Sequence, residues 1–299
     1  MSEQVKGAPI LTVLLIGLLW GLNWPAVKFM LTEMPPLTIR AVALSLAAIM
    51  LAILGKTKGL QLRPAPGDRM HMVITGLLVI FGFNVFTALG QLLTETSKAA
   101  IIAFTMPAFT AVFAAIFLGE RLGARSLIAL AIGMAGLAVL ASEDFSALIA
   151  EPLGPVVMLL AALSWALGTV ALKARTWSLP PLALTIWFFA VSGVACWPLV
   201  LIFEPPWHQS WPTAPVLWTL GYHTFGPMVV CYALWTTMVG RTSATIAAIA
   251  TLMVPVVGVA SAVILLGDPM TWQKILSLSM ILTSIFLTQR PVKQAQRTN

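Results

Sequence analysis

The sequence has few charged residues and only two cysteines, and both scarcities restrict what the protein can be. Charged residues make up 9% of the 299 positions and hydrophobic residues 59%, whereas an ordinary soluble domain is about 25% charged. So little charge excludes a soluble protein. Cys196 and Cys231 lie inside apolar runs without metal-type spacing, so we expect two small buried side chains and no disulfide or metal ligand. No cofactor is expected either.

The hydrophobic residues form continuous runs that are long enough to cross a membrane. A spanning helix needs about 20 apolar residues, and it satisfies its backbone polar groups internally. Continuous rather than alternating runs indicate helices. Cutting the chain where charges, prolines and glycines cluster predicts spans at 8–27, 36–54, 71–92, 96–118, 124–141, 154–173, 180–203, 214–238, 243–266 and 271–289. The predicted fold is an all-α polytopic membrane protein with ten transmembrane helices.

The cations predict which side of the membrane each loop faces, since loops rich in lysine and arginine stay in the cytoplasm. With the N-terminus inside, 13 cations fall on the cytoplasmic side and four, Lys28, Arg40, Lys98 and Lys274, fall on the outer side. Both termini are therefore expected in the cytoplasm. The net charge of +7 then reflects membrane orientation, and no stripe of exposed basic and aromatic residues suggests nucleic-acid binding.

Two stretches of the chain, 94–120 and 242–268, repeat one pattern at a constant offset, and weaker matches extend the repeat to the other spans. The matched pairs are Pro107 with Pro255, Gly119 with Gly267, Glu120 with Asp268, Trp20 with Trp165, Lys28 with Lys173, Asn84 with Tyr232 and Thr87 with Trp235. Each half of the chain therefore holds five of the predicted spans.

The repeat divides the chain into a first unit at 8–141, a second at 154–289 and a cytoplasmic tail at 290–299. Because five is odd, the two units must be inverted relative to each other. Inverted repeats around a central cavity let one site open alternately to the two sides of a membrane, as in secondary transporters. A membrane-embedded enzyme or lipid-handling protein has no such need, and the sequence lacks HExxH, nucleophile-triad and P-loop motifs.

Four segments resemble one family of transporters. They are LWGLNW at 19–24, FTMPAFTAVFAAIFLGERL at 104–122, SWALGT at 164–169 and TLMVPVVGVASAVILLGDPM at 251–270. Together they resemble the two EamA repeats of the drug/metabolite transporter superfamily, and the likeness covers essentially the whole chain. Its strongest element is a proline followed twelve residues later by Gly-Glu or Gly-Asp, once per half. Asp268 replaces the usual Glu and keeps its charge.

Within the superfamily the chain is most similar to the YddG type of bacterial amino-acid exporter. This resemblance implies export of aromatic and other neutral amino acids, or related small metabolites, across the bacterial inner membrane by alternating access. The expected partners are the small-molecule substrate and the lipid bilayer, with a monomer as one possible oligomeric state. No nucleic-acid partner is expected.

The energy for transport must come from a gradient, because the sequence has no ATP-binding motif. Ion coupling usually leaves an acidic residue deep in the membrane, and here every carboxylate lies near a helix end or in a loop. This favours a facilitator driven by the gradient of its own substrate. A proton-coupled multidrug or metabolite antiporter that works through His223 or Glu95 is the alternative.

Helical spacing predicts which side chains face the cavity. In the first span Trp20, Asn23 and Trp24 share one face, and in the third span amide and hydroxyl groups form a polar stripe along an apolar helix. Amides facing lipid would be costly, so the stripe should face protein or water. The predicted substrate-binding residues are Trp20, Asn23, Trp24, Asn84, Thr87, Gln91, Trp165, Thr169, Tyr232, Trp235 and His223.

These residues also have structural interpretations. Tryptophans are common in the belts at membrane interfaces and in helix packing, and Asn84 and Gln91 could hydrogen-bond between helices to hold the bundle together. His223 lies opposite Tyr232 on an ideal helix. Pro107 and Pro255 each remove an intrahelical hydrogen bond and therefore predict hinges in the fourth and ninth spans, with a static kink as the alternative.

Overall fold

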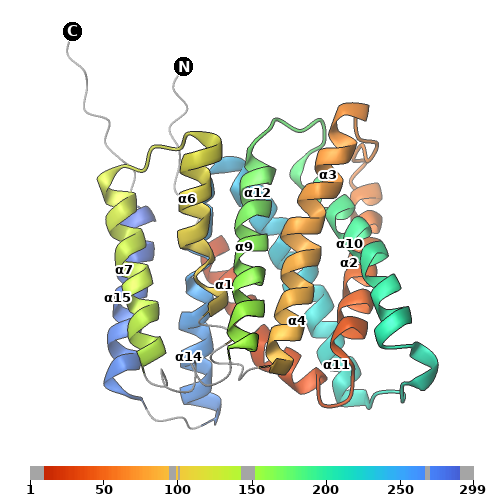
Figure 1. Cartoon of the computed structure of the whole chain (residues 1–299). Coiled ribbons are helices and arrows are strands. Elements are labelled where there is room, and N and C mark those ends of the chain that lie inside the picture. The colour runs from red at the N-terminus through yellow and green to blue at the C-terminus, as the bar shows by residue number, and fades with distance from the viewer. Residues whose placement is uncertain (1–9, 94–98, 100–101, 143–151, 267–269, 290–299) are drawn as a thin grey trace.

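The computed structural model describes residues 10–93, 99, 102–142, 152–266 and 270–289, and within these ranges the regular structure is entirely helical (Figure 1). Among the described residues, six helical segments are long and apolar enough to cross a membrane: α1 (Ile10–Met30), α2 (Pro36–Thr57), the segment Pro66–Leu93, α7 (Ala124–Ala141), α9 (Leu153–Lys173) and α10 (Pro181–Phe203). Shorter apolar helices lie at Met106–Leu118, Ala244–Ala260 and Trp272–Leu287. The predicted all-α membrane fold is confirmed at this level.

Two helical segments contain a π-helical stretch in their middle. One runs from the 3-10 turn η1 (Pro66–Asp68) and α3 (Arg69–Gly76) through η2 (Leu77–Gly82) to α4 (Phe83–Leu93). The other runs from α11 (Ala214–His223) through η5 (Thr224–Cys231) to α12 (Tyr232–Arg241). Such wider turns disturb the regular hydrogen-bond ladder and are frequent at functional sites.

A facing helix bonds to the backbone of each π-helical stretch. The hydroxyl of Ser164 on α9 donates a 2.7 Å hydrogen bond to the carbonyl of Leu78 in η2. On the other side, Nε1 of Trp20 on α1 donates a 2.9 Å hydrogen bond to the carbonyl of Pro227 in η5. These bonds tie α9 to η2 and α1 to η5.

Two other segments are interrupted just before a proline. A turn at 104–105 precedes α6 (Met106–Leu118), and a turn at 251–252 separates α13 (Ala244–Ala250) from α14 (Met253–Leu266). Pro107 and Pro255 thus lie in the first turn of a helix, where a missing N–H is not needed for the helical ladder. In both turns a threonine hydroxyl, that of Thr105 or Thr251, donates a 2.7 Å bond to the carbonyl three residues earlier. The chain is therefore interrupted at these places rather than kinked within one helix.

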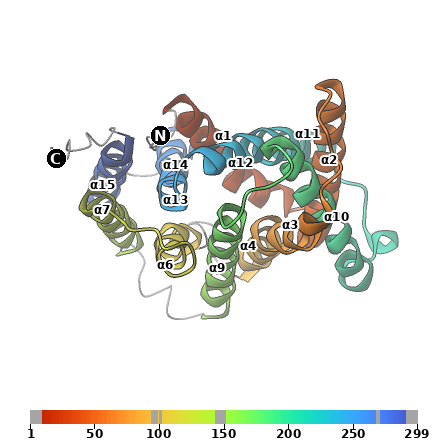
Figure 2. The same ribbon diagram turned by 90° about the horizontal axis from the view of Figure 1, so that it is seen from above.

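Helices from the two halves of the chain pack against each other (Figure 2). α2 packs on α10, α7 packs on α15 (Trp272–Gln289), α9 lies against α4 and α6, and α1 lies against α14 and η5. Glycines permit the closest approaches. A Cβ atom at Gly168 would lie 2.5 Å from the backbone nitrogen of Val79, and one at Gly21 would lie 2.7 Å from Cβ of Val257. Small residues that let backbones approach are typical of membrane helix interfaces.

Carboxylates at helix ends cap the first turns of distant helices. Glu204 accepts backbone N–H bonds from Leu37 and Thr38 at the start of α2, at 3.0 and 2.7 Å. Glu33 accepts a 2.7 Å bond from the backbone N–H of Thr213, which precedes α11. Such bonds satisfy donors that have no partner within the helix.

Cys196 and Cys231 are both buried and free, which confirms their prediction as small core residues. Glu95, Lys98, Gly267, Asp268 and the tail at 290–299 lie outside the described residues. The same holds for 96–98 and 100–101 in the predicted fourth span and for 267–269, the start of the loop that follows the ninth.

Candidate functional site

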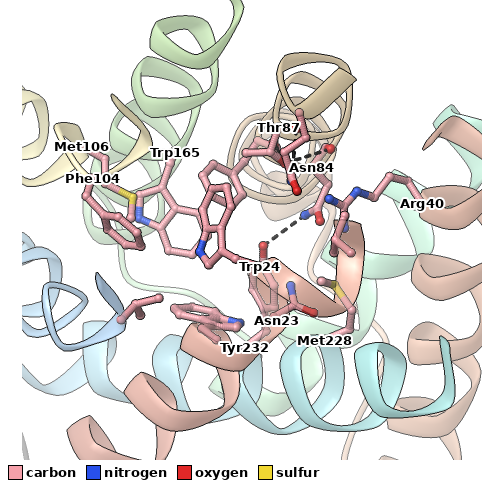
Figure 3. A pocket seen from close by; sticks show the side chains of 15 residues that line it. Asn23, Trp24, Arg40, Asn84, Thr87, Phe104, Met106, Trp165, Met228 and Tyr232 are labelled. Carbon is pink, nitrogen blue, oxygen red and sulfur yellow. Dashed lines mark hydrogen bonds between the residues drawn. The ribbon is translucent and has the colours of Figure 1, made fainter. Parts of the chain in front are cut away.

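A cavity lies where α1, α2, α4, α9 and α12 come together (Figure 3). Side chains from η5, α14, the turn before α6 and the first residue of α6 complete its wall. The lining residues are Trp20, Asn23, Trp24, Val27, Arg40, Phe83, Asn84, Thr87, Gln91, Phe104, Met106, Trp165, Met228, Tyr232 and Val254. The cavity is therefore built from both halves of the chain.

Aromatic rings make up much of the wall. The ring centroid of Trp165 lies 4.7 Å from that of Phe83, 5.5 Å from that of Trp20 and 5.7 Å from that of Tyr232. Tilted and edge-to-face contacts at such distances are favourable beyond the area that they bury. The indole nitrogen of Trp165 is buried and has no hydrogen-bond partner. The cluster thus gives the cavity an apolar aromatic wall, and Trp165 keeps an N–H donor without a partner among the described residues.

The polar stripe of α4 lies on the cavity side of its helix. Asn84 donates from Nδ2 to the carbonyl of Ile80 at 2.8 Å and to the hydroxyl of Tyr232 at 3.1 Å. Because the carbonyl of Ile80 only accepts, these two bonds fix the orientation of the Asn84 amide and leave its oxygen as an acceptor. Gln91 donates to the carbonyl of Thr87 at 3.3 Å, and its own buried carbonyl oxygen has no partner. The stripe therefore presents acceptor oxygens.

A buried arginine lies at the same cavity and is linked to two predicted site residues. Arg40 is 3% exposed, and its Nη1 atom lies 3.1 Å from Nε2 of His223. The other ring nitrogen of His223, Nδ1, lies 2.7 Å from Oδ1 of Asn23. Since arginine only donates, Nε2 accepts, and the ring proton on Nδ1 is donated to Asn23. The amide nitrogen of Asn23 is left as a donor.

Of the predicted site residues, eight line the cavity: Trp20, Asn23, Trp24, Asn84, Thr87, Gln91, Trp165 and Tyr232. The other three lie behind its wall. Thr169 donates to the carbonyl of Trp165 at 2.8 Å, the ring of Trp235 lies 4.6 Å from that of Trp165, and His223 supports Asn23. Their direct contact with a substrate stays a prediction, as does hinge motion at the two prolines.

The structural interpretations hold for Asn84 and Trp165 alongside their place in the cavity wall, whereas Gln91 bonds to Thr87 on its own helix and forms no bond between helices among the described residues. Asn84 forms an interhelical bond to Tyr232 and lines the cavity as well. Trp165 is packed at 1% exposure and also forms part of the wall. By contrast, Trp207 and Trp218 are 71% and 81% exposed, as expected of tryptophans outside the bundle core.

The sequence counts Arg40 among the outer-side cations, but the structure shows that its side chain is buried in the helix bundle. Arg40 lies inside α2 and is almost fully buried, because its guanidinium reaches His223 instead of solvent. Helical spacing also missed Phe83, Phe104, Met106 and Met228. Apolar side chains give no contrast on an apolar helix, so only the folded arrangement identifies them.

The charged group in the cavity wall is positive. Among the described residues that line it, Arg40 is the one with a full charge at neutral pH. The described carboxylates, Glu33, Asp68, Glu120 and Glu204, lie at helix ends or in turns and bond to backbone or hydroxyl groups there. No group of three or more His, Cys, Asp and Glu side chains that could hold a metal ion gathers within the described part of the chain.

Comparison with known proteins agrees with the arrangement of helices. The model of the EamA-like transporter family matches residues 7–142 and 152–290. The "Uncharacterized transporter YvbV" of Bacillus subtilis is 27% identical over 98% of this chain and 95% of its own length. A "Probable amino-acid metabolite efflux pump" of Escherichia coli is 26% identical over 92% of both chains. A solved crystal structure shares the fold with a TM-score of 0.75 at 18% identity, over 92% of this chain and 95% of its own.

Proposed function

The chain belongs to the EamA-like transporter family, and we propose that it exports amino acids, aromatic and other neutral ones, or related small metabolites. Export proceeds by alternating access across a bacterial inner membrane, without ATP hydrolysis and without enzymatic chemistry. The observation that carries this proposal is the cavity itself, which joins polar groups and aromatic rings from both halves of the chain. A relative named as a probable amino-acid metabolite efflux pump supports the substrate class.

The proposed architecture is ten transmembrane segments in two inverted five-helix repeats, at 8–141 and 154–289. Local geometry supports it, since π-helical stretches and interrupted helices occur once in each half at matched positions. The helix contacts support it too. When each segment is exchanged for its counterpart in the other half, the contact of η2 with α9 becomes that of η5 with α1, and α6 with α9 becomes α14 with α1. The pairs α2 with α10 and α7 with α15 map onto themselves.

Such a pseudo-two-fold arrangement gives two conformations of similar energy, one open to each side. The helix interruptions before Pro107 and Pro255 are the proposed hinges, because turn bonds to the carbonyl three residues earlier replace the regular helical ladder there. Both termini, with the tail at 290–299, are proposed to be cytoplasmic. The excess of cations on that side supports this orientation even without Arg40.

Flux measurements in proteoliposomes test the proposal. The purified protein is reconstituted into vesicles loaded with radiolabelled phenylalanine or threonine, and efflux is followed after dilution. We expect efflux well above that of protein-free vesicles, with Asn84→Leu as the inactive control. Efflux equal to that of protein-free vesicles for both amino acids would refute the proposal.

Proton-coupled antiport is the second candidate, because His223 is a titratable group linked to the cavity through Asn23. On His223 the facing groups are the cation Arg40 from α2 and the neutral amide of Asn23 from α1. A second proton on the ring would place its new N–H against the guanidinium, so the ring stays neutral. If the protein is a facilitator, flux should therefore change little between about pH 6 and pH 8. A steep pH dependence that disappears in His223→Ala would establish the antiporter instead.

A further inference from the structure

We infer that Arg40 anchors the carboxylate of the transported molecule, so that the cavity selects substrates with a free carboxylate. This inference rests on the proposed function, and it adds the chemical group that is recognised, the residue that recognises it and the orientation of the substrate. The substrate-binding residues predicted from the sequence include no arginine or lysine.

The guanidinium of Arg40 is buried but incompletely bonded. It is 3% exposed, its Nη1 contacts the neutral acceptor His223, and its Nε has no hydrogen-bond partner. No described carboxylate forms an ion pair with it. Burying a cation without an anion is costly, so such a group usually faces one. Because Arg40 lines the cavity, a bound carboxylate would complete its bonding there, in the planar two-point geometry that arginine favours.

His223 and Asn23 prepare the same end of the cavity. Nε2 of His223 accepts a 3.1 Å hydrogen bond from the guanidinium, and its Nδ1–H donates a 2.7 Å hydrogen bond to the Asn23 carbonyl. The Asn23 amide nitrogen is thereby held as a donor beside the arginine. Arg40 from α2 and Asn23 from α1 both line the cavity, so two groups offer N–H donors at this end. His223 is a positioning residue in this arrangement.

The rest of the cavity complements the other parts of an amino acid. Figure 3 shows Arg40, Asn23 and Asn84 at one end and Phe104, Met106 and Trp165 at the other. The carbonyl oxygens of Asn84 and Gln91 on α4 have no partner from the protein and can accept from an ammonium group. The aromatic end receives the side chain. The substrate thus lies with its carboxylate toward α2 and its side chain toward α6 and α9.

Rejection of carboxylate-free analogues follows from this orientation. A site built to hydrogen-bond one group discriminates strongly against molecules without it, because its own polar groups are then left unpaired. Phenylalaninamide keeps the shape and the side chain of phenylalanine but has no anion, and phenethylamine lacks the carboxylate altogether. A guanidinium at the site also repels both of them when they are protonated.

The first test uses the unaltered protein, purified in detergent, and measures how each compound raises the midpoint of thermal unfolding. We expect phenylalanine to stabilise the protein and both analogues to require at least about tenfold higher concentration for the same shift. Equal stabilisation by either analogue overturns the carboxylate anchor and leaves the proposed function standing. Stabilisation by none of the three compounds overturns both for aromatic amino acids.

The second test uses Arg40→Lys and Arg40→Gln, with Lys28→Gln as the matched control. Lys28 is an exposed cation at the end of α1 and does not line the cavity. The concentration of phenylalanine for half-maximal flux should rise at least about tenfold in Arg40→Gln, less in Arg40→Lys and not at all in Lys28→Gln. An unchanged value in Arg40→Gln overturns the inference. If Arg40→Gln does not fold, Arg40→Lys and the comparison of ligands on the unaltered protein decide.

Discussion

The carboxylate of Glu120, just beyond the end of α6, accepts a 3.0 Å hydrogen bond from the backbone N–H of Ala244, the first residue of α13. Its other oxygen accepts a 3.1 Å bond from the hydroxyl of Thr245. Gly119 precedes it in the left-handed region, with a φ of 62°, where glycine is favoured. The Gly-Glu pair that repeats in the sequence is therefore a structural link between α6 and α13.

Loss of this link should destabilise the protein. Glu120→Ala leaves the N–H of Ala244 without its partner, which costs about 1 kcal/mol for a helix cap, and we expect a lower midpoint of thermal unfolding in detergent. Arg121→Ala removes the exposed neighbouring side chain and should leave the midpoint unchanged. Equal midpoints for the two variants would show that the cap contributes nothing.

The contact between α9 and η2 gives a second stability prediction. A methyl group at Gly168 would lie 2.5 to 2.7 Å from the backbone N and Cα atoms of Val79 and from its Cβ atom. The backbone cannot move aside as a flexible side chain can. Gly168→Ala should therefore destabilise the protein by about 1–3 kcal/mol, the usual cost of overpacking. Gly221→Ala is the matched control, because nothing lies within 4 Å of its added methyl. A Gly168→Ala variant as stable as the control would contradict this packing.

Much of the helix arrangement could be predicted from the sequence, because membrane-spanning runs are set by composition. The Asn84, Thr87 and Gln91 stripe was also predictable, since α4 is a regular helix from Phe83 onward and keeps the α-helical period. Polar residues on an apolar helix stand out, and the cost of exposing them to lipid fixes the direction in which they face.

The rest of the site depends on features that no local pattern encodes. Arg40 counts among the outer-side cations because it lies close to the start of the predicted span 36–54, and only the contact with His223 shows that it is buried. For His223, nine residues of ideal helix put it about half a turn from Tyr232, but the π-helical η5 lies between them and changes that phase. The link from His223 to Asn23 joins residues 200 positions apart.

Substrate preference should depend on Trp165, whose ring lies within 6 Å of Phe83, Trp20 and Tyr232. Trp165→Ala removes aromatic surface from the end of the cavity where a side chain is expected to lie. The ratio of phenylalanine to threonine flux should fall about fivefold, because a lost ring contact costs about 1 kcal/mol and affects the larger side chain more. The ratio does not depend on the amount of protein. Trp218→Ala, at an 81% exposed position, should leave it unchanged, and an equal loss for both amino acids would assign Trp165 to packing alone.

The last prediction separates the two roles of Asn84, which bonds to Tyr232 across the helix interface and also lines the cavity. Asn84→Leu keeps the number and branching of the side-chain heavy atoms, and it removes both the bond to Tyr232 and the acceptor oxygen that we assign to the substrate ammonium. Tyr232→Phe removes only the bond between the two residues. If the acceptor binds substrate, flux should fall at least about tenfold in Asn84→Leu and much less in Tyr232→Phe, because hydrogen bonds to charged groups are about twice as strong as neutral ones. Both variants should elute as monodisperse protein from a sizing column. Similar fluxes in the two variants would show that the polar stripe only holds α4 against α12.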